Sequence, residues 1–579
     1  MIKNILTGFF LLVAVALQAQ LNKGGTPWSF SFDNGNLPEV DLVLTPPDLE
    51  SVAAEDLLHP VPYRFAINLP VNAGISTQLA VRTGQSGKDN HPATGNRQPA
   101  TGNRQPATGS WATLPNGDRI WLLTIQAPGA NAVTVYFDRF WIPEGGRLYL
   151  YSRDRSVLLG AFSELNNNNE ELFSTALIPG DQVTLEYDQP ANLADLPSLH
   201  ISEIAYAYRG IRGMDGKTGF GSSGDCEVNI HCEEGNNWQD EQKGIARVAV
   251  KKLSATYWCS GSLINNTRQD QTPYFLTADH CGQGAKPSDI SQWIFYFNYL
   301  SPTCENPAVE PGFRSMTGAV LKAAAGDVSV IGSDFLLLML NQPIPDTFGV
   351  WFNGWNREDI ASPSGVGIHH PMGDIKKIST YTTPLVSTTW NHPTKLTHWR
   401  VTWAGTLNGH GVTEGGSSGS PIFDPNGRIV GALTGGEANC DSAFLNKPDY
   451  YGKFSYSWDM NGSDATERLD FWLDPDNTGV QFLDGIPLIV PEPEVLSSNL
   501  LIYPNPASGV VNLKSSLFQN SQTMRITLLD SWGRPVASYV RSDTGSGQFS
   551  LDLTSLPNGF YLIRIASEEM ILTGRMVKL

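Results

Sequence analysis

The stretch Gly415-Gly-Ser-Ser-Gly-Ser-Pro-Ile-Phe-Asp424 decides which fold we expect for the central part of the chain. Its glycines and serines predict a tight turn, and the apolar residues after it predict a strand pair that ends near Thr434. Such a turn can expose Ser418 and direct backbone N–H groups toward the position of the oxyanion in a tetrahedral intermediate. We therefore expect Ser418 to be a nucleophile, with an oxyanion hole formed by the amides of Gly416 and Ser418.

Two earlier segments supply the other groups that a serine nucleophile needs. Tyr274-Phe-Leu-Thr-Ala-Asp-His-Cys-Gly282 predicts a strand that ends at His280, whose imidazole can take a proton from a hydroxyl and return it to a leaving amine. Ser333-Asp-Phe-Leu-Leu-Leu-Met-Leu340 places Asp334 at the start of a run apolar enough to be buried. There the carboxylate can accept the second ring proton of the histidine and hold its tautomer. The order His, Asp, Ser is that of chymotrypsin-type proteases.

The segments Thr277-Ala-Asp-His-Cys281 and Gly416-Ser-Ser-Gly-Ser-Pro421 resemble the histidine and serine signatures of trypsin-like proteases. Over residues 221–475, the chain resembles bacterial lysyl endopeptidases. Further shared landmarks are Trp258-Cys-Ser-Gly-Ser-Leu-Ile-Asn-Asn-Thr267, Ile368-His-His-Pro371 and Gly411-Val-Thr-Glu414. The resemblance implies a trypsin-like double β-barrel, and a serine endopeptidase that acts on polypeptides, hydrolyses the bond after lysine through an acyl-enzyme and needs no cofactor.

The specificity pocket is predicted from spacing within the same resemblance. Trypsin carries its pocket aspartate six residues before the nucleophile, and that position is Val412 here, so we do not expect a trypsin-type pocket. In lysyl endopeptidases the pocket carboxylate lies nine residues beyond the last cysteine, which in this chain is Asp449. A buried carboxylate favours a basic side chain, because an apolar one would leave it desolvated and unpaired. An arginine-preferring protease remains an alternative, since a carboxylate attracts both cations.

The resemblance also assigns Trp390 to substrate binding, because the family has a tryptophan beside the catalytic histidine at this place. The histidine that accompanies this tryptophan in the best-known members is replaced by Thr434. The histidines and cysteines are also candidates for metal ligands. The neighbours His369 and His370 would point to opposite faces of a strand, and no Cys-x-x-Cys occurs, so we expect no metal site.

All six cysteines lie between Cys226 and Cys440, and in an exported protein an even number predicts disulfide bonds. The sequence alone leaves their pairing open. The family resemblance implies the pairs Cys226–Cys440, Cys232–Cys304 and Cys259–Cys281. The last pair would hold the loop that carries His280.

Composition and the N-terminus restrict the class of protein. The positive start, the apolar run and the small residues of 1–20 predict a removable export signal, and no later stretch is apolar enough to span a bilayer. The formal net charge of -18 argues against nucleic acid as a partner. The 56 glycines and 38 prolines favour short strands joined by turns, so we expect a mainly β chain.

The chain divides further by pattern. Residues 21–217 alternate apolar and polar, which predicts a β-rich pro-region, and a repeat of Pro-Ala-Thr-Gly-Asn-Arg-Gln over 92–109 predicts a loop insertion. Residues 218–488 contain every cysteine and form the predicted protease domain. The proline- and glutamate-containing stretch 489–498 predicts a linker, and 499–579 predicts a β-sandwich.

Activation and export are expected at the two ends of the protease domain. A lysine-cutting enzyme could release itself at Lys217, just before the cysteine-bearing segment. Residues 499–579 contain Tyr503-Pro-Asn-Pro-Ala-Ser-Gly509 and Leu556-Pro-Asn-Gly-Phe-Tyr-Leu-Ile-Arg-Ile565, and resemble the C-terminal sorting domain of the type IX (Por) secretion system. The resemblance implies recognition by secretion machinery, followed by release or attachment at the outer cell surface. A carbohydrate-binding or adhesive module is the alternative.

A catalytically inactive, protease-like binding or adhesion protein is the competing hypothesis for the whole chain. The presence of His280, Asp334 and Ser418 together with the glycine turn favours the active enzyme.

Overall fold

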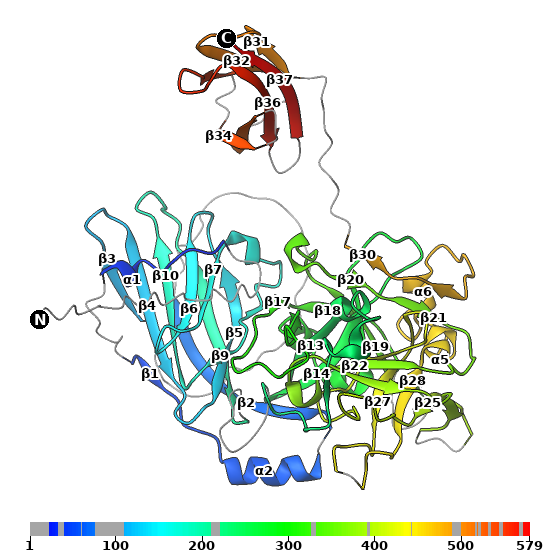
Figure 1. Ribbon diagram of the computed structural model, residues 1–579. Coiled ribbons are helices and arrows are strands. Elements are labelled where there is room, and N and C mark those ends of the chain that lie inside the picture. Colours follow the sequence, from blue (N-terminus) through cyan, green and yellow to red (C-terminus); the bar gives the residue numbers. More distant parts are fainter. Residues whose placement is uncertain are drawn as a thin grey trace, which may run out of the picture. The chain divides into compact units, whose positions relative to one another are not determined.

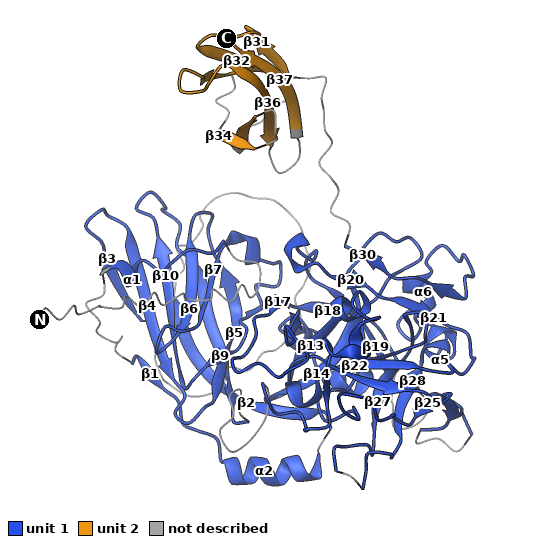
Figure 2. Ribbon diagram, in the orientation of Figure 1, with its two compact units in different colours: residues 1–488 blue, residues 489–579 orange. Residues whose placement is uncertain are grey.

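The computed structural model describes residues 23–32, 40–59, 61–75, 109–209, 220–325, 332–390, 394–441, 443–488, 500–515, 518, 523–530, 534–542, 548–566 and 571–579. The predicted export signal, nearly all of the repeat, Lys217 and the predicted linker lie outside these residues. The chain forms two compact units, residues 1–488 and 489–579 (Figure 2). Both are built mainly from antiparallel strands (Figure 1), so the predicted mainly β fold class is confirmed.

One layer of the N-terminal region (residues 21–217) is a six-stranded sheet in the order β1-β4-β10-β6-β7, with β3 paired to β4. Its strands are β1 (Leu42–Val43), β3 (Ser110–Thr113), β4 (Arg119–Gln126), β6 (Arg147–Ser152), β7 (Leu158–Phe162) and β10 (Gln182–Gln189). Every residue of the central β10 is buried, because strands cover both of its edges and side chains cover both of its faces.

A 12-stranded sheet continues from the N-terminal region into residues 218–488, the predicted protease domain, hereafter the protease segment. The first region contributes β2 (Tyr63–Ile75), β5 (Ala132–Trp141), β8 (Phe173–Ser174), β9 (Ile178–Pro179) and β11 (Ser198–Ala207). The protease segment contributes β13 (Ile245–Lys252), β14 (Ala255–Leu263), β15 (Tyr274–Ala278), β16 (Ile294–Phe297), β17 (Arg314–Thr317), β18 (Ala319–Ala324) and β19 (Phe335–Leu340). The junction is the antiparallel pair of β2 and β14.

The two regions also share a hydrophobic core at this junction. Phe65 stacks on Trp258 with ring centroids 4.0 Å apart and an interplanar angle of 9°. The hydroxyl groups of Tyr136 and Thr256 form a buried hydrogen bond of 2.9 Å across the same boundary. The protease residues that belong to the core of the N-terminal region are Ala249, Trp258, Ile294 and Tyr296. The boundary is therefore packed like the interior of one domain.

A ten-stranded sheet completes the protease segment, with the central order β12-β23-β22-β26-β27-β28-β25-β24. Its strands are β12 (Val228–Asn229), β21 (Gly354–Asn356), β22 (Gly365–His369), β23 (Lys377–Tyr381), β24 (Val386–Thr388), β25 (His398–Val401), β26 (Pro421–Phe423), β27 (Arg428–Gly436), β28 (Asp449–Lys453) and β29 (Phe482–Leu483). The strands β20 (Trp351–Phe352) and β30 (Ile486–Pro487) form a separate pair.

Helices are short throughout unit 1, and no helix among the described residues has the length and apolar character needed to cross a membrane. The α-helices are α1 (Ser29–Phe32), α2 (Leu49–Leu58), α3 (Asp279–Gly282), α4 (Pro287–Ile290), α5 (Phe454–Asp459) and α6 (Asp470–Leu473). The 3₁₀ turns are η1 (Glu164–Asn166), η2 (Glu233–Gly235), η3 (Glu241–Gly244), η4 (Asp346–Phe348) and η5 (Pro371–Gly373).

The second unit consists of two antiparallel sheets. One contains β31 (Leu501–Tyr503), β32 (Val510–Lys514) and β35 (Gln548–Asp552), and the other contains β33 (Thr523–Leu529), β34 (Pro535–Ser542), β36 (Gly559–Ala566) and β37 (Ile571–Lys578). Val511 and Leu513 of the first sheet share one buried core with Ile526 and Ile563 of the second. Two sheets around a common core form the β-sandwich that the sequence predicts.

Candidate active site

His280 and Asp334 lie at adjacent ends of two paired strands. β15 and β19 run antiparallel, with Ala278 opposite Phe335, so α3, which follows β15 and contains His280, meets Asp334, the residue before β19, at one edge. His280 Nδ1 lies 2.7 Å from Asp334 Oδ2, and the backbone N–H of His280 donates to Asp334 Oδ1 at 2.9 Å. The structure therefore brings these two predicted residues together with the geometry of an oriented imidazole.

The Asp334 side chain is fully buried, and its backbone has φ +55°, a left-handed conformation that is uncommon for a residue other than glycine. Burial acts to raise the pKa of this carboxyl. The opposing effects of the His280 charge and of hydrogen bonds from His280 and Thr434 lower the pKa overall. The ionised carboxylate can only accept hydrogen bonds, so it holds the proton of His280 on Nδ1.

The other ring nitrogen of His280 is left without a partner. His280 Nε2 is buried and makes no hydrogen bond to any described residue. In enzyme structures without substrate, the contact between base and nucleophile is often loose and forms in the substrate complex. A neutral imidazole with a protonated Nδ1 and a free Nε2 can accept a proton from a hydroxyl.

The turn that carries Ser418 is attached to the strand beside His280. The backbone N–H of Ser260 in β14 donates to the carbonyl oxygen of Ser418 at 2.8 Å, and Ser260 Oγ donates to the carbonyl oxygen of Gly416 at 2.9 Å. Gly419 has φ +81°, and a Cβ there would overlap Thr277 Oγ1 of β15. The glycines and serines predicted to form a tight turn are therefore needed for its close approach to β14 and β15.

The amides of Gly416 and Ser418, predicted to form the oxyanion hole, are not used inside this turn. The N–H groups of Ser417, Gly419 and Ser420 all donate to backbone carbonyl oxygens. No hydrogen bond from the other two amides is found among the described residues. Two unused N–H donors in this turn, one of them the amide of Ser418 itself, can stabilise an oxyanion.

His369 anchors the same turn, a role that sequence reasoning missed. Ser379 Oγ donates to the carbonyl oxygen of Val412 at 2.8 Å, so it accepts from His369 Nε2 at 2.9 Å. Nδ1 then accepts from Ser417 Oγ at 2.8 Å. Burial lowers the pKa of His369 to about 3, which keeps the ring neutral as this pattern requires. Its neighbour His370 contacts the carbonyl oxygen of Asp374 at 2.9 Å instead.

Asp449, the predicted pocket carboxylate, is the first residue of β28 and is buried. Its Oδ2 accepts from Trp403 Nε1 at 2.7 Å and from Thr413 Oγ1 at 2.8 Å, and its Oδ1 accepts from the backbone N–H of Ala438 at 3.2 Å. Gly436 lies opposite in the strand pair, and a Cβ there would overlap Asp449 Oδ1. The missing side chain of Gly436 thus leaves room for the Asp449 carboxylate beside the neighbouring strand.

The electrostatic environment of Asp449 lacks a positive charge. Burial raises its pKa to about 6, although the donors from Trp403, Thr413 and Ala438 act in the opposite direction. No lysine or arginine within the described ranges forms an ion pair with it, and its hydrogen-bond donors are uncharged groups. A buried carboxylate held only by neutral donors is suited to receive a cation from outside the chain.

Trp390 lies beside the end of β27 that faces Asp449. Its ring centroid is 5.8 Å from that of His398 and 5.2 Å from that of Tyr450. A Cβ on Gly435 would be 3.9 Å from the Trp390 ring. Sequence reasoning missed His398, because its local sequence carries no pattern that would distinguish it.

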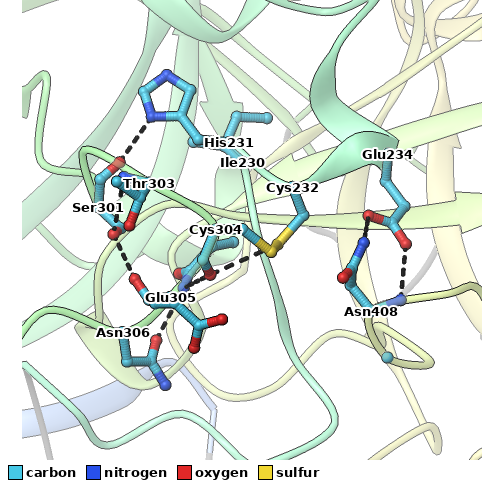
Figure 3. The surroundings of a disulfide bond; sticks show 12 residues. Ile230, His231, Cys232, Glu234, Ser301, Thr303, Cys304, Glu305, Asn306 and Asn408 are labelled. Atoms are coloured by element: carbon cyan, nitrogen blue, oxygen red, sulfur yellow. Dashed lines mark hydrogen bonds between the residues drawn. A yellow bond between two sulfur atoms is a disulfide. The ribbon is translucent and has the colours of Figure 1, made fainter.

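Three disulfides join the pairs that the resemblance implies, Cys226–Cys440, Cys232–Cys304 and Cys259–Cys281. Cys259–Cys281 connects β14 to α3 directly beside His280. Figure 3 shows Cys232–Cys304 and, near it, the 2.7 Å contact of His231 Nδ1 with the carbonyl oxygen of Ser301. The Cys232–Cys304 bond instead joins the start of η2 to the segment that follows β16.

Comparison with known proteins identifies two parts of the chain. Residues 220–452 match the family model described as lysyl endopeptidase, C-terminal domain, and residues 501–578 match the secretion system C-terminal sorting domain. A lysyl endopeptidase of Pseudomonas aeruginosa is 28% identical over 363 residues, which are 60% of this chain and 75% of that protein. These matches confirm the resemblances predicted from sequence.

Solved structures were also matched. The protease Anisep from Arthrobacter nicotinovorans is 18% identical, with a TM-score of 0.27, and the match covers 36% of this chain and 90% of that one. A Glu endopeptidase is 17% identical, with a TM-score of 0.23, and the match covers 40% of this chain and 93% of that one.

Proposed function

We propose that this secreted serine protease, which is similar to lysyl endopeptidases, cleaves polypeptides after lysine through an acyl-enzyme. The observation that carries the proposal is the buried Asp449 carboxylate, which accepts hydrogen bonds only from neutral donors and pairs with no cation among the described residues. A lysine ammonium placed there would neutralise a charge that the protein itself leaves uncompensated.

In the acylation step, Ser418 Oγ attacks the carbonyl carbon of the lysine residue while His280 Nε2 takes the hydroxyl proton. Asp334 stabilises the imidazolium that forms, through the 2.7 Å contact with Nδ1. The amides of Gly416 and Ser418 donate to the oxyanion. His280 then gives its proton to the amine of the departing peptide, which leaves with a new amino terminus. The other half of the substrate remains bound to Ser418 as an ester.

In the deacylation step, His280 takes a proton from water, which attacks the ester carbonyl. The second tetrahedral intermediate collapses, the proton returns to Ser418 Oγ, and a peptide with a C-terminal lysine leaves. The three residues return to their starting protonation states, so no cofactor is consumed.

Preference for a basic side chain follows from the cost of leaving Asp449 unpaired. An apolar side chain in the pocket would displace water from the carboxylate without replacing its charge partner. We propose lysine in place of arginine on the similarity to lysyl endopeptidases.

The test compares peptides that differ only in having lysine, arginine or leucine before the cleaved bond. We expect the lysine peptide to be cut with the highest kcat/KM, and Asp449→Asn to reduce that value by roughly 100-fold or more. Thr413→Val is the matched control, because it removes one donor and keeps the charge. Faster cleavage of the arginine peptide, or unchanged selectivity in Asp449→Asn, would contradict the assignment.

A serine-directed phosphonate separates an enzyme from a catalytically inactive protease-like protein. We expect stoichiometric labelling at Ser418 and none in Ser418→Ala. Absence of labelling in the folded wild-type protein would reject catalysis altogether.

We also propose that residues 21–217 are a pro-region, 218–488 the protease domain and 499–579 the part recognised by the secretion machinery. Deletion of 499–579 should retain the protein in the periplasm, and N-terminal sequencing of the secreted form should find a start near Thr218. Normal export of the truncated chain, or a start far from 218–221, would refute the respective proposal.

A further inference from the structure

His398 is a buried histidine that the reaction described above does not use. It is the first residue of β25, no part of it is exposed, and both ring nitrogens have partners. Nδ1 lies 2.7 Å from Thr397 Oγ1, and Nε2 lies 2.9 Å from Thr434 Oγ1. The Thr434 side chain also lies close enough to Asp334 to lower the pKa of that carboxyl, as a hydrogen-bond donor does. A continuous chain of contacts therefore leads from His398 through Thr434 to the carboxylate that orients His280.

The partners determine the direction of every hydrogen bond in this chain. An ionised Asp334 can only accept, so the Thr434 hydroxyl must donate to it. The single hydroxyl proton is then used, and Thr434 Oγ1 must accept from His398 Nε2–H. His398 Nδ1 is consequently unprotonated and accepts from Thr397 Oγ1.

The backbone at Thr434 is shaped for this contact. The pairing register of β27 with β28 shifts between Leu433 and Gly435, so Thr434 lies at a β-bulge. A bulge redirects a side chain relative to its neighbours in the strand. Here the redirected hydroxyl lies between the ring of His398 on β25 and the carboxylate of Asp334 before β19.

The surroundings keep His398 neutral, as the chain of hydrogen bonds requires. Burial lowers the pKa of His398 to about 4, Lys453 acts in the same direction, and Asp334 opposes both. Lys453 is itself engaged, with Nζ 2.7 Å from Asp359 Oδ1 and 2.6 Å from Ser387 Oγ. The ring of Trp390 lies next to that of His398, with centroids 5.8 Å apart.

We propose that His398 is a positioning residue for the catalytic Asp334. His398 Nε2 donates to Thr434 Oγ1, so the threonine hydroxyl accepts from His398 and directs its own proton to the Asp334 carboxylate. Asp334 is then held in the rotamer that meets His280 Nδ1. The proposal rests on the proposed function, since it concerns the efficiency of that same triad.

The experiment compares two replacements of His398 in the full secreted protein. His398→Phe keeps a flat ring beside Trp390 and removes the donor, whereas His398→Gln places an amide N–H near the position of Nε2. We expect His398→Phe to lower kcat about 10- to 100-fold with KM for a lysine peptide changed less than about twofold. His398→Gln should recover most of that loss. His231→Phe, a replacement of a histidine outside the site, should leave both constants unchanged.

A second pair of variants tests the link itself. Thr434→Val removes the hydroxyl and Thr434→Ser keeps it, so the first should lose kcat like His398→Phe and the second should not. The double variant His398→Phe with Thr434→Val should be no slower than the worse single variant, because both interrupt one chain.

Several outcomes would overturn the proposal. These are full activity of folded His398→Phe, equal losses in His398→Phe and His398→Gln, a loss confined to KM, or additive losses in the double variant. If His398→Phe does not fold, the comparison of Thr434→Val with Thr434→Ser decides. Failure of the proposed function is recognised separately, because the wild-type protein would then neither cut lysine peptides nor react with the phosphonate.

Discussion

Tyr63 of the N-terminal region lies directly opposite Trp258 of the protease segment, in the pairing of β2 with β14. Two residues further along β14, Ser260 holds the turn of the proposed nucleophile through the carbonyl oxygens of Gly416 and Ser418. A Cβ on Gly415 would lie 2.8 Å from the Tyr63 ring. The N-terminal region therefore packs against the strand and the turn that position the proposed catalytic serine.

This relationship predicts that cutting the connection at Lys217 does not separate the two regions. The 4.0 Å stacking of Phe65 on Trp258 and the shared core are contacts of a domain interior, not of a loose surface. We expect the cut fragments to elute together in size-exclusion chromatography under native conditions and to separate only in denaturant.

Phe65→Ala should weaken this association, because it removes a buried aromatic contact with Trp258. Leu57→Ala is the matched control, since Leu57 is 85% exposed on α2. Separate elution of the wild-type fragments in native buffer would show that the interface is insufficient to hold them.

Affinity for lysine substrates should fall as the pH decreases through about 6. The raised pKa of Asp449 means that its carboxyl becomes protonated near that pH and loses its charge for the ammonium. KM for a lysine peptide should rise steeply below pH 6, while KM for a leucine peptide should not follow. A parallel rise for both peptides would place the titrating group elsewhere.

Loss of the Cys259–Cys281 disulfide should lower catalytic activity even under conditions in which the protein remains folded. The bond connects β14 to α3 across 22 residues, and a loop of that length is worth about 3 kcal/mol of stability. The Cys259→Ser, Cys281→Ser double variant should unfold at lower urea concentration and label more slowly at Ser418. The corresponding double variant of Cys232 and Cys304 should lose stability with little change in the labelling rate.

His369→Phe should lower kcat, because Ser417 would lose the acceptor that fixes the turn next to Ser418. Both ring nitrogens of His369 contact serine hydroxyls, at 2.8 and 2.9 Å, so neither is available to bind a metal ion. We therefore expect activity not to require a metal at this histidine. Treatment with a chelator should leave wild-type activity unchanged, measured with the lysine peptide. Inactivation by chelator and recovery with zinc would contradict this assignment.

The strands next to His280 and Asp334 could be predicted from sequence, because each is a short apolar run, followed by His280 in one case and preceded by Asp334 in the other. The disulfide pairs followed from the family resemblance, since spacing alone left them open. The pairing of β2 with β14 joins residues almost 200 positions apart, and no local pattern specifies such a contact. His398 and Thr434 were missed as a pair for a related reason. Their contact depends on a β-bulge, which shifts a register that sequence periodicity cannot detect.

The hydrophobic core that the N-terminal region shares with the protease segment affects when and where the protein can mature. Complete removal of residues 21–217 would expose Trp258, Ile294 and Tyr296 to water and leave β14 with an open edge. An apolar strand edge is a template for aggregation with other chains. Stripping the protease of this cover is therefore safest in dilute surroundings, after the molecule has left the crowded compartment in which it was made.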